Sequence, residues 1–264
     1  FVTNDVPVKV SSVSKDLAAV YPLQNVLVTA QLDESLPVDQ FVYLRYSTTT
    51  NYSESVLLKM SVSGTTATGT IPAAYNIPSR TVYYYVFTSS IDNMTGLTAD
   101  LNLKLLEVNN NNTTGGYTYT VNSGYVSSAD GAWSDAGSWN AGVVPPDGTP
   151  VTIAGGTSVS LTNQTVNVSS LTIAGSLTNN NSTIEILEEG TLTATSGTYT
   201  DNGGTVYCYG NATFTGNITF NNLITAGGIN VVTGAVVNGT LEIEDGGYLT
   251  GQTITYGTSS TLKY

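Results

Sequence analysis

The feature that most constrains the fold of this chain is a degenerate repeat in its second half. Four segments share a core in which Ser or Thr precedes a leucine, and these leucines are Leu171, Leu192, Leu241 and Leu262. The interval from Leu171 to Leu192 equals that from Leu241 to Leu262, and the gap between the two pairs is more than twice as long, with room for two further units. A spacing of roughly 20 residues with one short strand per unit is typical of a solenoid whose turns bury their apolar side chains against each other. We therefore predict a right-handed parallel β-helix over residues 117–264, with a second antiparallel sandwich as the alternative.

The first part of the chain, up to Val108, has a different pattern. Seven short segments alternate apolar and polar residues, as expected of strands with one buried face. These segments are 6–13, 26–32, 41–46, 55–62, 66–71, 81–88 and 101–106. Seven strands within about 100 residues, with no helical period, fit an immunoglobulin-like or fibronectin-III-like β-sandwich. The chain is thus predicted to be all-β, with a sandwich over residues 1–108.

A polar run separates the two patterns. Residues 109–116 consist of Asn, Thr and Gly only, so the segment has no side chain with which to join a core. We interpret it as a flexible linker between two domains. A long polar loop within a single domain is the alternative.

Charge and composition exclude several classes of function. The 19 acidic and 7 basic residues give a net charge of −12, which repels phosphate backbones and anionic lipids, so no nucleic acid partner is expected. No apolar run reaches the roughly 18 residues of a membrane-spanning helix, so no membrane insertion is expected either. Histidine is absent, and no Lys or Arg occurs between Glu107 and Leu262. The commonest general base and the basic residue of polysaccharide lyases are therefore missing from the solenoid, and we predict that the chain is not an enzyme.

The two tryptophans, Trp133 and Trp139, are candidate glycan-binding residues. They lie close together in a Gly-, Asp- and Ser-rich stretch just before the first solenoid strand. Two exposed indoles can stack on sugar rings. The alternative, which we favour, is that they form an N-terminal cap over the open end of the β-helix.

Three aspartates near the tryptophans are candidate metal ligands. Asp130, Asp135 and Asp147 occur in turn-like sequence, and carboxylate and backbone oxygens there can bind Ca²⁺, the one cofactor that the sequence suggests. Their spacing matches neither the EF-hand nor the glycine-rich nonapeptide repeat. Capping of local turns by Asp side chains is the simpler interpretation.

Other polar and reactive residues receive structural interpretations. Glu242 and Glu244 flank an apolar residue and point outward on one face, the ordinary pattern of a hydrated strand, so no catalytic residue is assigned. Thr191 and Thr193 alternate about Leu192 as in a hydroxyl ladder, but the coils differ in sequence, so a regular ladder is not expected. Cys208, the only cysteine, follows an alternating pattern and is expected to be a buried packing residue.

Two sets of segments resemble known secreted proteins. Residues 43–47, 56–61, 69–72 and 82–87 resemble a fibronectin-III-like module of large secreted proteins of Bacteroidetes-type bacteria. Residues 133–139, 144–145, 151–153, 219–223 and 256–264 resemble β-helical surface proteins of the same group, many of them exported by the type IX, gliding-associated secretion system. The resemblance implies an extracellular location on the bacterial surface, adhesion and contact with polysaccharide. No C-terminal sorting domain follows Tyr264, so we expect a fragment of a longer protein.

Together these features predict a non-catalytic segment of an extracellular surface protein with a structural or adhesive role, such as an adhesin. Its expected partners are a polysaccharide or other surface ligand, or copies of itself assembled into a filament, because an uncapped β-helix end is a template for pairing. The alternative is a glycan-binding accessory region of a secreted carbohydrate-active enzyme whose catalytic domain lies outside this chain.

Overall fold

The computed structural model describes residues 7–52, 54–90, 92, 116–194 and 196–264. It confirms the all-β fold class, because the described helical elements are the short 3-10 turns η1 (Ala73–Tyr75) and η3 (Ala136–Ser138). The chain forms two compact units, Phe1–Asn122 and Ser123–Tyr264. Among the residues that the structure describes, no helix has the length and apolar character needed to span a membrane.

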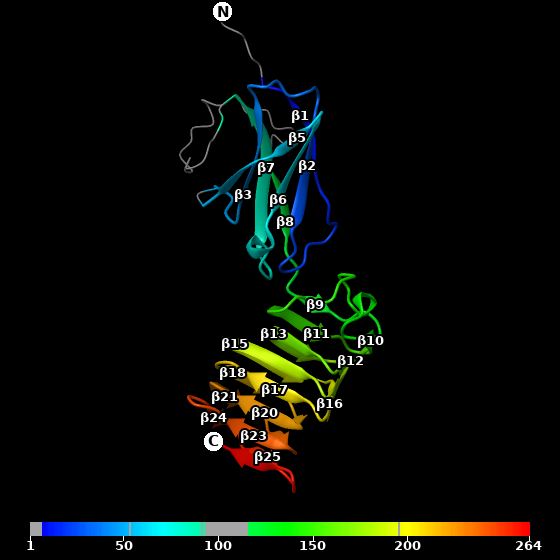
Figure 1. The fold of residues 1–264 in the computed structure, drawn as a ribbon, viewed down its shortest axis with the longest axis vertical. Helices are drawn as coiled ribbons and strands as arrows, with labels where there is room; N and C mark the ends of the chain where they lie inside the picture. Colours follow the sequence, from blue (N-terminus) through cyan, green and yellow to red (C-terminus); the bar gives the residue numbers. More distant parts are fainter. Residues whose placement is uncertain (1–6, 53, 91, 93–115, 195) are drawn as a thin grey trace, which may run out of the picture. The chain divides into compact units, whose positions relative to one another are not determined.

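The first unit is a β-sandwich of two four-stranded antiparallel sheets (Figure 1). One sheet has the order β1-β2-β6-β5, with β1 (Val10–Lys15), β2 (Val26–Leu32), β6 (Thr66–Ile71) and β5 (Ser61–Ser63). The other has the order β4-β3-β7-β8, with β4 (Val56–Lys59), β3 (Phe41–Ser47), β7 (Thr81–Ser89) and β8 (Tyr117–Thr120). The predicted strand 55–62 is in fact two strands in different sheets, since the chain crosses between the sheets at the buried Met60.

Alternate residues of the strands build the sandwich core. Val26, Val28 and Ala30 of β2 are buried in the same cluster as Val82 and Val86 of β7. Because successive strand residues point to opposite faces, every second residue of each sheet reaches the shared interior. The alternation seen in the sequence therefore becomes a two-layer core, as predicted.

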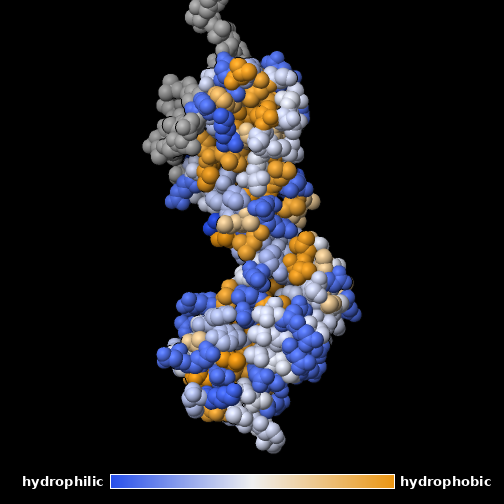
Figure 2. Space-filling model, viewed as in Figure 1, coloured by the Kyte–Doolittle hydropathy of each residue, from blue (hydrophilic) through white to orange (hydrophobic). Residues whose placement is uncertain are grey.

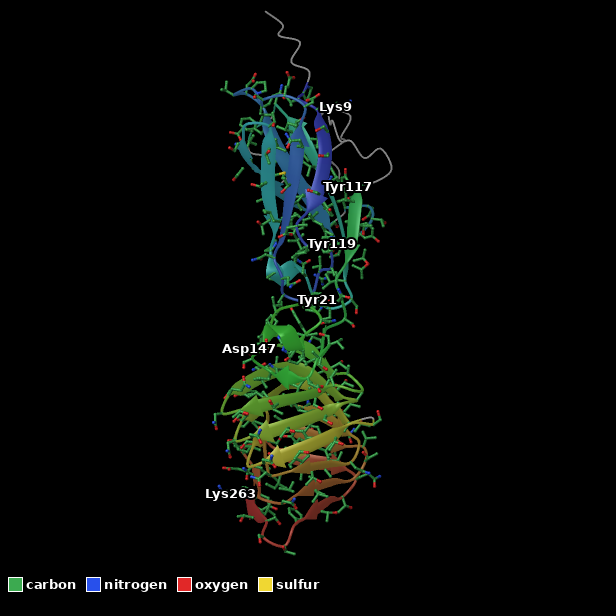
Figure 3. The ribbon with its side chains drawn as sticks, turned by 90° about the vertical axis from the view of Figure 1, so that its right-hand side faces the viewer. Lys9, Tyr21, Tyr117, Tyr119, Asp147 and Lys263 are labelled. Atoms are coloured by element: carbon green, nitrogen blue, oxygen red, sulfur yellow. The ribbon has the colours of Figure 1, made fainter. Side chains whose placement is uncertain are left out.

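The boundary of the sandwich lies further along the chain than the sequence indicated. Strand β8, which we assigned to the solenoid, pairs antiparallel with β7 in the first unit. Its Tyr119, labelled in Figure 3, is buried in the sandwich core. The hydroxyl of Tyr119 donates a hydrogen bond of 2.7 Å to Oδ1 of Asn76. Residues 117–122 thus belong to the sandwich, and the solenoid begins at Ser123. The predicted strand 101–106 and residues 109–115 of the predicted linker lie outside the described residues.

The second unit is a parallel β-solenoid of about six turns. Its sheets are β10-β12-β14-β16, β19-β22-β25 and a large sheet whose main order is β24-β21-β18-β15-β17-β20-β23-β26. The strands are β9 (Tyr125–Val126), β10 (Gly131–Ala132), β11 (Thr149–Ile153), β12 (Ser158–Thr162), β13 (Thr165–Ile173), β14 (Ser176–Asn180), β15 (Thr183–Ala194), β16 (Thr198–Asn202), β17 (Thr205–Cys208), β18 (Ala212–Thr215), β19 (Ile218–Phe220), β20 (Asn222–Thr225), β21 (Gly228–Val231), β22 (Ala235–Val237), β23 (Thr240–Ile243), β24 (Tyr248–Gly251), β25 (Ile254–Tyr256) and β26 (Thr261–Lys263).

The repeated leucines pair as their spacing predicts, but in two separate columns. Leu171 pairs with Leu192, and Leu192 with Phe214. Leu241 pairs with Leu262 in a second column. The long strand β15 takes part in both columns, because its first half pairs with β17 and its second half with β18. The longer interval between Leu192 and Leu241 therefore spans a change of column as well as further turns.

Candidate functional site

The outward-facing surface of one solenoid sheet carries hydrogen-bonding side chains in a straight line. The second half of β15 is followed along the solenoid by β18, β21 and β24, stacked in that order (Figure 1). Their outward residues Thr191, Thr213, Asn230 and Thr250 are direct neighbours in the strand register. We call these four residues the axial column. Figure 2 shows that the visible face of this unit carries mostly hydrophilic and intermediate residues, with a few hydrophobic patches.

A second line of hydroxyl groups runs beside the axial column. Thr152, Thr172, Thr193 and Thr215 are register neighbours on four successive strands. On β15 and β18 this line lies two positions beyond the axial column, with Thr193 beyond Thr191 and Thr215 beyond Thr213. The two lines therefore share one face of the sheet and run side by side over these two turns. The sequence predicts no regular ladder, because the coils differ in their other residues. The structure shows a partial ladder, since pairing aligns the Ser/Thr-x-Thr segments 170–172, 191–193 and 213–215.

An open groove of about 160 Å³ adjoins the axial column. Its polar and aromatic lining consists of Glu189, Asn211, Thr213, Asn230, Tyr248 and Thr250. The small residues Gly190, Ala212 and Gly228 also line it and leave its interior hollow. Three members of the axial column are thus part of the groove wall.

Tyr248 supplies the aromatic surface of the groove. Its side chain is 53% exposed. A Cβ atom at Gly228, its register partner, would lie 2.5 Å from Cζ of this tyrosine, so only glycine leaves room for the ring there. An exposed aromatic ring beside polar groups is the usual arrangement for stacking on a sugar.

Asn211 holds the polar side of the groove in place. Its Nδ2 donates a hydrogen bond of 3.3 Å to Oε1 of Glu189, and its Oδ1 accepts one of 3.2 Å from the backbone N–H of Gly228. Glu189 has a left-handed backbone with φ of 59°, which turns the chain between the two halves of β15. The carboxylate of Glu189 is therefore oriented by Asn211, which is itself fixed to the backbone. The remaining lone pairs of this carboxylate can accept hydrogen bonds from ligand hydroxyls.

A second group of aromatic and acidic side chains lies in the other strand column, on β17 and directly after β17 and β23. The rings of Tyr207 and Tyr209 are 4.6 Å apart, and the hydroxyl of Tyr207 donates a hydrogen bond of 2.7 Å to Oε2 of Glu244. The carboxylate of Glu244 raises the pKa of Tyr207 to about 12, because the neutral hydroxyl is the better donor to it. Glu242 forms an ion pair with Lys263 at 3.5 Å. These glutamates are surface residues with local partners, in agreement with the hydrated-strand interpretation.

Trp133 and Trp139 do not form a sugar-stacking surface. Both are 2% exposed, and their rings pack edge to face at 4.9 Å. Trp139 donates a hydrogen bond of 2.8 Å from Nε1 to the backbone oxygen of Trp133. The backbone N–H of Trp133 in turn donates to the backbone oxygen of Ser160. This corrects the glycan-binding assignment, because both indoles are buried in the first turn of the solenoid. That position agrees with the N-terminal cap that the sequence also suggested.

The three candidate calcium ligands are not brought together. Asp130 accepts a hydrogen bond of 2.7 Å from the N–H of Ser158, and Asp135 caps η3 by accepting one of 2.9 Å from Gly137. Asp147 is exposed in the turn before β11 (Figure 3). Within the described part of the chain, no three Asp, Glu, Cys or His side chains lie close enough together to hold a metal ion. Asp135 therefore has the local turn-capping role that was the alternative, whereas Asp130 bonds the first residue of β12 in a distant segment.

Cys208 is fully buried in the solenoid core, as expected. Burial raises the pKa of its thiol to about 12, so the thiolate needed for nucleophilic or redox chemistry is disfavoured. Cys208 is therefore a packing residue.

The groove residues are not predictable from the sequence, because they are far apart in the chain. Glu189 and Tyr248 come from different turns, and neither lies in a motif. One signal for the groove is present in the sequence. Glycines recur at the corners along one edge of the solenoid, where the absence of a side chain leaves space. They are Gly210, Gly227, Gly228, Gly246 and Gly247.

Comparison with protein-family models, with curated proteins and with solved structures finds no match for this chain. The chemistry of the groove therefore has to be inferred from its own residues and geometry.

Proposed function

We propose that this chain is a non-catalytic segment of an extracellular bacterial surface protein with a structural and adhesive role. In this proposal the solenoid is a stiff support and its groove adheres to polysaccharide. The observation that supports this proposal most directly is a single groove. It is lined by the exposed Tyr248, by the oriented carboxylate of Glu189 and by three residues of the axial column. The extracellular location and type IX export rest on the sequence resemblance alone.

The chemistry of the groove favours a sugar ligand. Sugars present apolar C–H faces that pack on aromatic rings and hydroxyl groups that both donate and accept hydrogen bonds. Tyr248 provides the ring, Glu189 provides acceptors, and Thr213 and Asn230 provide groups that donate and accept. Thr250, whose hydroxyl donates to the backbone oxygen of Ile229, provides an acceptor. Weak contacts of this kind become strong adhesion when many copies act together on one surface.

The same residues favour binding over hydrolysis. Glycoside hydrolases use two carboxyl groups roughly 5 to 9.5 Å apart, on either side of the scissile bond. Among the described residues that line the groove, Glu189 is the one carboxylate, and Asn211 occupies one of its oxygens. The proposed role is therefore retention of a polysaccharide without cleavage.

A glycan-binding accessory region of a secreted carbohydrate-active enzyme is the second candidate, favoured by the same groove. Both candidate functions require the groove of this chain to bind a glycan. They differ in whether the parent protein also contains a catalytic domain.

The test is a pull-down of the full chain on insoluble polysaccharides together with a glycan array. Tyr248→Ala is the test variant, and Tyr256→Ala, which removes a 46% exposed tyrosine from β25 in another sheet, is the matched control. We expect the wild type and Tyr256→Ala to bind at least one polysaccharide and Tyr248→Ala to lose about tenfold in affinity. Failure of the wild type to bind any glycan, or equal binding by Tyr248→Ala, would refute the groove as an adhesive site.

A further inference from the structure

The repeat of the axial column restricts the shape of a ligand that can use it. Thr191, Thr213, Asn230 and Thr250 come from four successive turns and are direct register neighbours. Neighbouring strands lie about 4.7–4.9 Å apart, so the column offers one hydrogen-bonding side chain at each such step along the solenoid axis. Along a single strand, by contrast, outward residues recur at about 6.6 Å.

We propose, as an extension of the adhesive function above, that the site takes a neutral polysaccharide with an extended β-1,4-linked backbone. The polysaccharide chain lies along the solenoid axis and places one sugar unit over each turn. The rise per sugar of such an extended backbone is slightly larger than the distance between adjacent strands, about 4.7–4.9 Å. Successive sugars are turned over along the ribbon, so hydroxyl groups of its two edges alternate over the axial column. Each sugar then meets a fresh member of the axial column. Coiled glycans, such as those with β-1,3 or α-1,4 backbones, curve away from a straight column.

The partial hydroxyl ladder beside the axial column supports this direction. Thr172, Thr193 and Thr215 repeat at the same step as the axial column and run parallel to it. A ribbon-shaped glycan has hydroxyl groups along both edges, and over β15 and β18, where the two rows run side by side, protein hydroxyls match both edges. A ligand lying across the rows would meet only one turn of each.

Tyr248 and Glu189 mark one side of the site. Tyr248 opens β24, the last strand of the column, and Glu189 precedes Gly190 at the turn in the middle of β15. The ring, the carboxylate and three members of the axial column, Thr213, Asn230 and Thr250, line one groove. The ring of Tyr248 lies over Gly228 of β21, so a sugar over that turn can stack on the ring while its neighbours contact Thr250 and Thr213.

Charge selects among extended polysaccharides. Residues 123–264 contain ten acidic residues and a single basic one, Lys263, and Glu189 lies in the groove itself. This field repels uronic-acid polymers, whose carboxylates recur along the chain. The inferred ligand is therefore a neutral glycan such as a β-1,4-linked glucan, mannan or N-acetylglucosamine polymer.

The experiment measures the affinity of the full chain for soluble oligosaccharides by isothermal titration calorimetry. The series contains β-1,4-linked glucose and N-acetylglucosamine oligomers of two to six units, β-1,3-linked and α-1,4-linked glucose hexamers, and a β-1,4-linked mannuronate hexamer as the charged polymer of the same linkage. We expect affinity to rise with each added unit up to four in at least one β-1,4 series. The two other neutral hexamers are expected to bind at least tenfold more weakly, and the mannuronate hexamer should not bind.

Two matched threonine variants test the direction of the ligand. Thr213→Val removes a hydroxyl of the axial column at nearly constant volume, and Thr219→Val does the same at an exposed position of β19 in another sheet. We expect Thr213→Val to lower affinity for the tetramer several-fold and to weaken the gain from dimer to tetramer, while Thr219→Val behaves as wild type.

The outcomes separate the two levels of the proposal. Binding that is equal for β-1,4, β-1,3 and α-1,4 hexamers, or that does not rise beyond the dimer, would overturn the axial arrangement and leave the adhesive groove standing. Absence of binding to every glycan, with the chain shown to be folded by circular dichroism, would overturn both.

Discussion

The ring of Tyr248 occupies the space that a side chain at Gly228 would fill. The Cβ atom of an alanine at position 228 would lie 2.5 Å from Cζ and 2.7 Å from the hydroxyl oxygen of Tyr248. The same Cβ atom would also lie 2.8 Å from Oδ1 of Asn211. One glycine therefore sets the position of both the aromatic and the polar side of the groove.

Gly228→Ala is expected to weaken polysaccharide binding with little loss of stability. The methyl group displaces the ends of two flexible side chains, so the fold adjusts while the groove loses its shape. We expect about a tenfold loss in affinity in the pull-down assay. Gly234→Ala is the control, because a Cβ there meets no atom within 4 Å. A Gly228→Ala variant that binds as well as the control would show that the Tyr248 position is not needed.

The buried tryptophan pair is expected to stabilise the first turn of the solenoid. Trp139→Phe removes the Nε1 donor and leaves the backbone oxygen of Trp133 without that bond, at a cost of about 1–3 kcal/mol in the free energy of unfolding. Trp139→Ala also leaves a cavity and should cost about 3–5 kcal/mol. Urea unfolding followed by circular dichroism measures both. Tyr264→Ala is the control, since that side chain is 91% exposed, and equal stability of all four proteins would contradict the cap.

The buried thiol of Cys208 predicts alkaline destabilisation of the solenoid. Burial raises its pKa from 9.0 to about 12, so between these values the folded state binds more protons than the unfolded state. The free energy of unfolding should therefore be unaffected by this group below pH 9 and fall as the pH rises toward 12. Cys208→Ala should be less stable at pH 7 and have a shallower fall between pH 9 and 11, measured by urea unfolding at each pH. Parallel curves for the two proteins would contradict this.

Strand β8 is expected to be necessary for the sandwich. A chain of residues 1–122 should unfold cooperatively, whereas a chain of residues 1–108 lacks β8 and leaves the core beside β7 open. Comparison of their thermal transitions by circular dichroism tests this. Equally cooperative unfolding of the two chains would show that the sandwich ends at residue 108 and does not need β8.

A single substitution tests the same strand more finely. Tyr119→Phe removes the donor to Oδ1 of the fully buried Asn76, and we expect a loss of about 1–3 kcal/mol in the free energy of unfolding. Thr118→Ala, at an exposed position of the same strand, should have little effect. Equal stability of the two variants would indicate that the hydrogen bond contributes nothing net.

Sequence by itself determined the all-β class, the two architectures and the buried position of Cys208. The reason is that these properties follow from local periodicity: alternation marks a strand with one buried face, and the spacing of Leu171 and Leu192 marks one turn of a solenoid. Turn capping by Asp135 also follows from short-range chemistry.

Only the tertiary structure decided which strands pair, which side chains are exposed and which residues meet. Leu192 and Leu241 share a motif but stand in different columns, and Trp133 and Trp139 proved to be buried. Glu189 and Tyr248 line one groove although they lie in distant parts of the chain. Strand register and side-chain burial depend on contacts between segments that are distant in the sequence. The favoured register is the one in which the total free energy of all contacts over a whole turn of the solenoid is lowest. No local pattern in the sequence carries that sum.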